Sequence, residues 1–228
     1  MTTNFFSKNA FGYLALGLSL AVTLGCMGYA SSLSTVETVA LDTGFYYLVT
    51  DDTHVEAGAE FVRLEGGAGY LLEQNGREYV ALTVFLSEKE GRIVQATLEM
   101  QNKPTQLIKT AQSKLYLKTA LDKEKSALYK GAFDSLQGCI TVLNDCTERL
   151  EKGMTQEQCK RILGALLRQF TYLGKAYQTD FSAFSMVCTN TAQTLSAIIN
   201  DTVYLKDLRY LLCQTAGDYV ALAKVFSL

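Results

Sequence analysis

Residues 44–111 decide the fold, and they read GFYYLVTDDTHVEAGAEFVRLEGGAGYLLEQNGREYVALTVFLSEKEGRIVQATLEMQNKPTQLIKTA. The apolar, aromatic run at residues 45–49 is rich in β-forming side chains and too short for a helix. Thr53 and Glu56 have the spacing of a capping box, which predicts that a helix begins here. Gly66 and Gly67 end that helix, whose expected buried side carries Val55, Ala59, Phe61 and Val62.

Two further strands are expected at residues 70–74 and 78–85, joined by Asn75-Gly76, a dipeptide that favours a tight hairpin. A second capping box, from Ser87 to Glu90, opens a helix through Ile93, Val94 and Leu98, and a last strand covers residues 106–110. The order β-α-β-β-α-β predicts an α+β, ferredoxin-like domain at residues 44–112, with both helices on one face of a four-stranded sheet.

This segment resembles the SPOR (sporulation-related repeat) domains between about residues 45 and 110. The likeness rests on an aromatic first strand, Tyr46-Tyr47-Leu48-Val49, and on small residues in the first helix, Ala57 and Ala59. It also rests on the turn into the second strand, Gly67-Ala68-Gly69-Tyr70, and on the third strand, Gly76 with Tyr79-Val80-Ala81-Leu82. The resemblance implies an extracytoplasmic, non-catalytic domain that binds peptidoglycan glycan strands on the open face of its sheet.

The open face is predicted from the alternation of side chains along strands. If Tyr47 and Val49 point to the two helices, the opposite, glycan- or partner-binding face carries Tyr46, Leu48, Thr50, Tyr70, Val80, Leu82 and Val84. SPOR domains usually present polar or basic side chains there, whereas this face is largely apolar. An apolar sheet face is rarely left in water, so we expect the C-terminal part of the chain or another subunit to cover it.

Composition limits the classes of function. Residues 43–112 carry 6 Lys and Arg against 10 Asp and Glu, and an acidic module of this kind argues against nucleic acid as a partner. His54 is the only histidine and sits at a helix start, where capping is its expected role. No nucleophile, phosphate-binding or metal-binding motif is present, so we expect no enzyme activity, no cofactor and no metal.

A membrane anchor is expected at residues 10–30, which contain no charged side chain and are long enough to cross a bilayer. Lys8 precedes this run. In the 22 residues that follow the run, the charged side chains are all acidic, with no Lys or Arg among them. Residues 1–30 are therefore expected to be a cytoplasmic tip and a single span in the cytoplasmic membrane, with the N-terminus inside and the bulk of the chain extracytoplasmic.

Two alternatives to a retained anchor stay open. Gly28-Tyr29-Ala30 is a small-x-small triplet at which a signal peptide could be cleaved. Thr23-Leu24-Gly25-Cys26 resembles a loose lipobox, in which Cys26 would be lipidated. Polar residues 31–43 are expected to form a linker.

Residues 113–228 are expected to form an antiparallel helical bundle with a coiled-coil-like core. Apolar spacing predicts one helix ending at Gly153, a second that starts at a capping box from Thr155 to Gln158 and continues to about residue 200, and a third from about residue 205. The second pattern contains an extra step between Tyr177 and Phe181, which indicates a stutter or a local break.

The six cysteines lack metal-type spacing, so buried free thiols are expected, although a bridge between helices that involves Cys159 stays open.

Two functions follow as expectations. One is peptidoglycan association in cell division or sporulation. The other is an envelope scaffold that associates with a protein partner or with itself, and in which the sheet binds no glycan.

Overall fold

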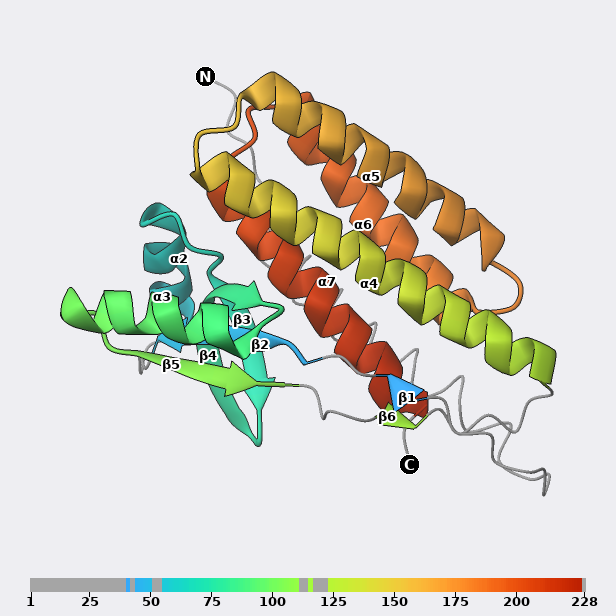
Figure 1. The fold of residues 1–228 in the computed structure, drawn as a ribbon, viewed down its shortest axis with the longest axis horizontal. Coiled ribbons are helices and arrows are strands. Elements are labelled where there is room, and N and C mark those ends of the chain that lie inside the picture. The colour runs from blue at the N-terminus through green and yellow to red at the C-terminus, as the bar shows by residue number, and fades with distance from the viewer. Residues whose placement is uncertain (1–39, 42–43, 51–54, 111–114, 117–122, 227–228) are drawn as a thin grey trace.

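The computed structural model describes residues 40–41, 44–50, 55–110, 115–116 and 123–226 of the chain. Its elements, in order, are β1 (Ala40–Leu41), β2 (Tyr46–Thr50), α2 (Val55–Leu64), β3 (Tyr70–Gln74), β4 (Arg77–Phe85), α3 (Glu88–Met100), β5 (Thr105–Lys109), β6 (Leu115–Tyr116), α4 (Lys123–Glu151), α5 (Gln156–Ala176), α6 (Ser182–Asn200) and α7 (Leu205–Phe226). The protein is α+β and mostly helical, and a small sheet and a helical bundle lie side by side (Figure 1).

The larger sheet has four antiparallel strands in the order β3-β4-β2-β5. The elements from β2 to β5 follow the predicted order β-α-β-β-α-β, with β4 lying between β2 and β3 as in a split βαβ unit. Asn75 and Gly76 have φ angles of 54° and 73°. Positive φ at both positions allows the tight hairpin between β3 and β4, so this turn prediction is confirmed.

Three helix-end predictions are confirmed by backbone geometry, and one is wrong. Gly66 and Gly153 take φ angles of 90° and 97° after α2 and α4, the left-handed conformation expected of glycine at a helix end. Thr155 and Gln158 make both bonds of the capping box before α5, each 3.3 Å long. Ser87 precedes α3 in an extended conformation, but its side chain makes no capping hydrogen bond.

Described residues 123–226 form four helices instead of the three predicted for the C-terminal part. The expected middle helix is divided into α5 and α6, because the chain leaves the helix at Tyr177 and Phe181 takes a φ of −147°. The extra step in the apolar pattern therefore marks a turn. Each helix packs against two others of the bundle, α4 on α5 and α7, and α6 on α5 and α7. Short connections between successive helices make these neighbours antiparallel.

Two short strands differ from the sequence prediction. Ala40–Leu41 was expected in a linker and Leu115–Tyr116 in a helix, yet they pair antiparallel as β1 and β6. The two segments are 75 residues apart in the chain. A local pattern of apolar residues cannot predict pairing over such a distance. The predicted anchor at residues 10–30, Cys26 and His54 lie outside the described residues. Among the helices that the structure describes, none is long and apolar enough to cross a membrane.

The two parts share one hydrophobic core. Phe45 lies before β2, and its ring meets Tyr219 of α7 edge-on at a centroid distance of 5.5 Å. On its other side Tyr219 meets Phe133 of α4 at 5.2 Å. Both Phe45 and Tyr219 are fully buried, so apolar packing runs from the sheet through α7 into the bundle. In Figure 1, α7 is the helix of the bundle beside the sheet.

Candidate functional site

Helix α7 covers one face of the sheet. It packs on β4 and β3, and the Tyr47 hydroxyl of β2 donates a 2.8 Å hydrogen bond to the Cys213 carbonyl oxygen of α7. Directly paired residues of antiparallel strands share a face, so Val84 and Ile108 lie with Tyr47 on this side. All three are buried. We call this surface the α7 face of the sheet.

The opposite side, the α3 face, packs against α3. Leu48 pairs with Thr83 and Leu107, and an atom added at Cβ of Gly91 in α3 would lie 2.7 Å from the Leu107 side chain. Helix α2 packs on β4 and β3, and its Val62 is buried. Both faces of the sheet are thus covered by helices.

The predicted open face does not exist as one surface. Tyr46, Leu48 and Thr50 lie on the α3 face, because their neighbour Tyr47 points to α7. The assignment of Tyr47 to the side of the two helices was therefore wrong. Tyr70 lies on the α7 face, where its ring packs edge-on against Tyr210 of α7 at 5.8 Å.

A β-bulge divides the predicted residues of β4. Leu48 pairs with Thr83 and Val49 pairs with Ala81, so Leu82 has no partner in β2. The extra residue reverses the alternation along the strand. Val80, which pairs with Thr50, consequently lies on the α3 face, whereas Val84 lies on the α7 face. Assigning Val80, Leu82 and Val84 to a single face was wrong for this reason.

The contact between α7 and the sheet is a cluster of tyrosines beside the partly buried acid Asp218. Tyr47 and Tyr70 stack at a centroid distance of 6.2 Å, and Gly217 makes room for them, since a Cβ there would lie 2.7 Å from the Tyr70 hydroxyl oxygen. Burial raises the pKa of both tyrosines well above its ordinary value. Burial also raises the pKa of Asp218 to about 7, so this carboxyl exchanges its proton near neutral pH.

Two arginines link α7 to the edge of the sheet domain through salt bridges and hydrogen bonds. Arg63 of α2 forms a 2.7 Å salt bridge with Asp207 at the start of α7, and its guanidinium lies over the Tyr210 ring. Arg209 of α7 donates to the Gly66 carbonyl oxygen at 2.9 Å and to Glu151 of α4 at 2.8 Å. These contacts link α2, α4 and α7, so the helix is held on the sheet by polar bonds as well as by apolar packing.

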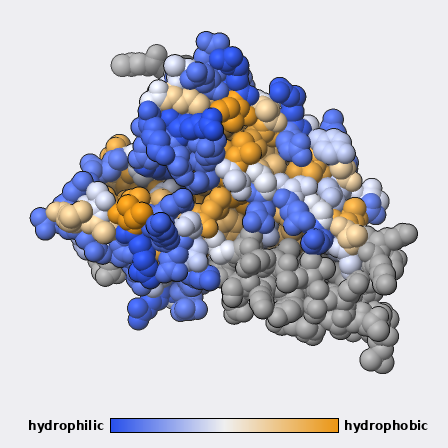
Figure 2. Space-filling model, viewed as in Figure 1, coloured by the Kyte–Doolittle hydropathy of each residue, from blue (hydrophilic) through white to orange (hydrophobic). Residues whose placement is uncertain are grey.

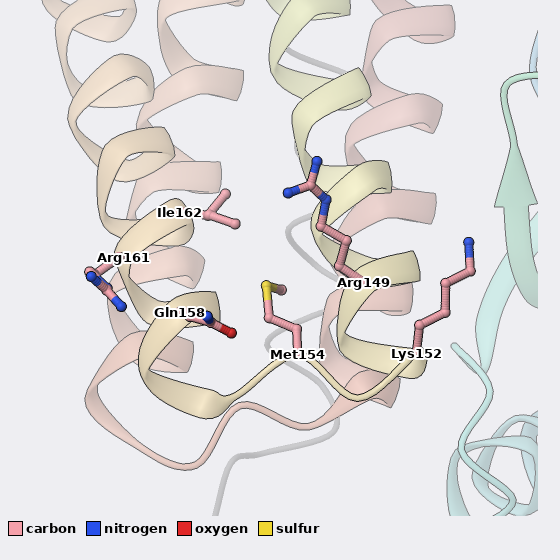
Figure 3. A pocket seen from close by; sticks show the side chains of 6 residues that line it. All are labelled: Arg149, Lys152, Met154, Gln158, Arg161 and Ile162. Atoms are coloured by element: carbon pink, nitrogen blue, oxygen red, sulfur yellow. The ribbon is translucent and has the colours of Figure 1, made fainter.

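A pocket of about 550 Å³ lies at the turn between α4 and α5 (Figure 3). Its lining residues are Arg149, Lys152, Met154, Gln158, Arg161 and Ile162, and Met154 and Ile162 point into the space between the two helices. Each of the three cations has an acidic partner four residues earlier: Asp145, Glu148 and Glu157. An anionic ligand would have to compete with these partners, so the pocket is a weak site for anions.

Several large hydrophobic side chains are exposed on the outer surface of the sheet domain. Nine large hydrophobic side chains are exposed in the described part of the chain, and six of them belong to α2, β3 and α3: Phe61, Leu64, Leu71, Ile93, Val94 and Met100. Figure 2 shows hydrophobic residues among hydrophilic ones on the side of the molecule that carries α3. The expected burial of Phe61 was wrong, since 61 % of its surface is exposed.

Helix α3 explains this exposure. Its only buried residue is Gly91, and the absence of a side chain lets the helix backbone approach Leu107 and Phe85. The stripe that faces the sheet is therefore Gly91, Gln95 and Leu98, while Ile93 and Met100 face outward. The spacing of Gly91 and Leu98 was the available signal, but the stronger apolar pattern of Ile93 and Val94 concealed it.

The described residues contain no group of three or more His, Cys, Asp or Glu side chains placed to hold a metal ion. Asp218, Arg63, Arg209 and Gly91 were not singled out from the sequence, because their roles depend on partners far away in the chain. No protein-family model, no curated protein and no solved structure matches this chain, so the likeness to SPOR domains stays a prediction.

Proposed function

We propose that this protein is a non-catalytic scaffold of the bacterial cell envelope, whose SPOR-like sheet binds no glycan. Residues 10–30 would anchor it in the cytoplasmic membrane with the N-terminus inside and the folded part outside. The main support is the hydrogen bond from Tyr47 to the Cys213 carbonyl, which belongs to an α7 face that is filled by side chains of the same chain. A sugar would have to displace α7 to reach that face.

The opposite face offers no better glycan site. Leu48 and Val80 are buried beneath the helices, and the outward side of α3 carries Ile93 and Met100. Carbohydrate recognition needs hydrogen-bonding groups for hydroxyls, which aliphatic side chains do not supply, whereas apolar side chains that gather on a surface favour contact with a protein. We therefore assign protein association, with a second copy or another envelope protein, to the outer surface of α2 and α3.

Sedimentation with isolated peptidoglycan sacculi tests the absence of glycan binding. We expect the full-length protein, purified in detergent, to stay in the supernatant at physiological salt. A known peptidoglycan-binding domain added to the same tube should sediment and so show that the sacculi are competent. Sedimentation of the protein with the sacculi, retained after a high-salt wash, would contradict the proposal and favour the alternative role in peptidoglycan association during division or sporulation.

Substituting Ile93 with glutamate tests the proposed association surface. Ile93 is 58 % exposed, so the change should leave the fold stable, but a charge at the centre of an apolar contact should weaken association by more than about tenfold. Analytical ultracentrifugation of the full chain, with cross-linking in envelope fractions, measures the effect. Val142→Glu on α4 is the matched control, since Val142 is an aliphatic residue that is 43 % exposed on a helix of the bundle.

The unchanged chain should self-associate or cross-link to an envelope protein, and Val142→Glu should behave in the same way. The proposal is wrong if the unchanged chain is monomeric and cross-links to nothing. The assignment to α2 and α3 is wrong if Ile93→Glu and Val142→Glu are indistinguishable from the unchanged chain.

A further inference from the structure

Two cysteines face each other where α4 meets α5. Cys146 lies near the end of α4 and Cys159 in the first turn of α5, and their sulfur atoms are 3.5 Å apart. Both side chains are fully buried. A disulfide requires a sulfur–sulfur distance of about 2.05 Å, so a movement of roughly 1.5 Å would bring the atoms to bonding distance.

Cys159 has the surroundings of a reactive thiol. It follows the N-cap Thr155 by four residues, and its amide donates to the Thr155 carbonyl oxygen at 2.9 Å, which places it at the positive end of the α5 dipole. The Cys146 thiol and the Cys159 sulfur are hydrogen-bonded, and this bond lowers the pKa of Cys159 while it raises that of Cys146. The N-terminus of α5 favours the thiolate at Cys159, whereas Cys146 lies near the C-terminal end of α4 and lacks this effect.

The other described cysteines differ in chemistry. Burial raises the pKa of Cys139 to about 11 and that of Cys188 to about 12, and it also raises the pKa of Cys213. Thiols in such surroundings react slowly, because the thiolate is the nucleophile. The contact with Cys146 and the helix N-terminus thus distinguish Cys159 from other buried cysteines of the same bundle.

We propose that Cys146 and Cys159 are a redox-active pair, which a small peroxide such as hydrogen peroxide converts into an intramolecular disulfide. The Cys159 thiolate attacks one peroxide oxygen, the O–O bond breaks, and the departing hydroxide takes from solvent the proton that Cys159 released on ionising and becomes water. This step leaves Cys159 as a sulfenic acid. Cys146 then loses its proton and attacks the Cys159 sulfur, the S–O bond breaks, and a second water departs with that proton.

Residues close to both cysteines in the chain line the pocket at the α4–α5 turn. Arg149 lies one turn after Cys146, while Gln158 and Ile162 lie directly before and one turn after Cys159, and all three line the pocket. The hydrogen bond with Cys159 and burial raise the pKa of Cys146, and the Arg149 guanidinium opposes this rise, which favours the ionised form that the second step requires. The resulting bond links two helices across their connecting turn, and a dithiol reductant reverses it by thiol–disulfide exchange.

Peptide mapping of the oxidised protein tests the pair. The full chain, purified in detergent under reducing conditions and freed of reductant, is treated with a slight excess of hydrogen peroxide. We expect a mass loss of about 2 Da, one peptide pair joined through Cys146 and Cys159, and a Tm raised by roughly 6–12 °C that a dithiol returns to its starting value. A matched variant, Cys188→Ser, should form the same link, because Cys188 is an equally buried thiol outside the pair.

Single substitutions test the order of the two steps. With Cys146→Ser, dimedone should label Cys159 as a trapped sulfenic acid, whereas Cys159→Ser should give neither label nor link. The peptide-mapping test uses the unchanged chain, so it does not depend on whether a variant folds. Absence of the linked Cys146–Cys159 peptide pair after peroxide treatment would overturn the proposal. Labelling of Cys146 in Cys159→Ser, at the rate seen for Cys159 in Cys146→Ser, would overturn the assignment of Cys159 as the attacking sulfur.

Discussion

Replacing Tyr47 with alanine is expected to lower the free energy of unfolding by about 3–5 kcal/mol, the range for removing a large side chain from a packed core. Tyr47 is completely buried between β2 and α7, stacks on Tyr70 and donates to the Cys213 carbonyl. Its removal leaves a cavity and deletes a hydrogen bond at the contact that joins the sheet to the bundle. Urea denaturation followed by circular dichroism measures the loss.

Tyr46→Ala is the matched control, one residue away in the same strand. Tyr46 lies on the opposite face, is only partly buried, and has Lys109 over its ring. We expect this change to cost about 1 kcal/mol, the size of an exposed cation–π contact with limited burial. Equal losses for the two variants would contradict the assignment of Tyr47 to the α7 face.

Tyr47→Phe separates the hydrogen bond from the packing. The phenylalanine ring keeps the stack on Tyr70, and only the bond to Cys213 is lost. The expected cost is about 0.5–1.5 kcal/mol, the net value of one such bond. A cost as large as that of Tyr47→Ala would mean that the hydroxyl, and not ring packing, holds α7 on the sheet.

Asp218 is expected to make the protein less stable as the pH rises from 4 to 8. In the unfolded chain the carboxyl loses its proton near 3.8, whereas burial between α7 and the sheet raises its folded pKa to about 7. Between these values the folded state holds a proton that unfolding releases, so higher pH favours unfolding. Above about pH 7 both states are ionised and the loss is complete, at roughly 2–4 kcal/mol.

Asp218→Asn should remove this dependence, because an amide cannot ionise. The groups beside Asp218 are Tyr47, Tyr70 and Tyr210, which stay neutral over this pH range because burial raises the pKa of each. We therefore expect the variant to match the unchanged chain near pH 4 and to be more stable at pH 8. Urea unfolding at several pH values gives both curves.

Asp134→Asn is the control for the pH series, since the Asp134 side chain is 58 % exposed on α4. Its curve should run parallel to that of the unchanged chain. Parallel curves for Asp218→Asn as well would show that the Asp218 carboxyl is not buried at the contact between α7 and the sheet.

Local chemistry was enough to locate most elements of the fold. Asn75-Gly76, Gly66 and Gly153 are placed where the backbone takes a positive φ, and glycine or asparagine is nearly required at such positions. The capping box at Thr155 likewise marks the start of α5. These features depend on atoms within a few residues of each other, so they could be read without knowledge of any distant partner.

The candidate site was harder to predict, because its residues come from separate parts of the chain. Tyr47 and Cys213 are 166 positions apart, and Arg63 and Asp207 are 144 apart. Nothing near Asp218 in the sequence indicates that tyrosines of β2 and β3 lie beside its carboxyl. The sequence left open a bridge between helices that involves Cys159, but it did not identify Cys146 as the facing thiol, because that contact depends on how the α4–α5 turn brings the two helices together.

The sequence by itself determined the order of strands and helices, the hairpin, the helix ends and an apolar character on both faces of the sheet. Only the tertiary structure decided which face meets α7 and where Leu82 bulges out of the pairing, and it showed that the irregular step between Tyr177 and Phe181 is a break instead of a stutter. The physical reason is that the alternation of side chains along a strand defines two faces of the sheet but does not specify which helices pack on each face. When both faces are apolar, long-range packing alone chooses between them.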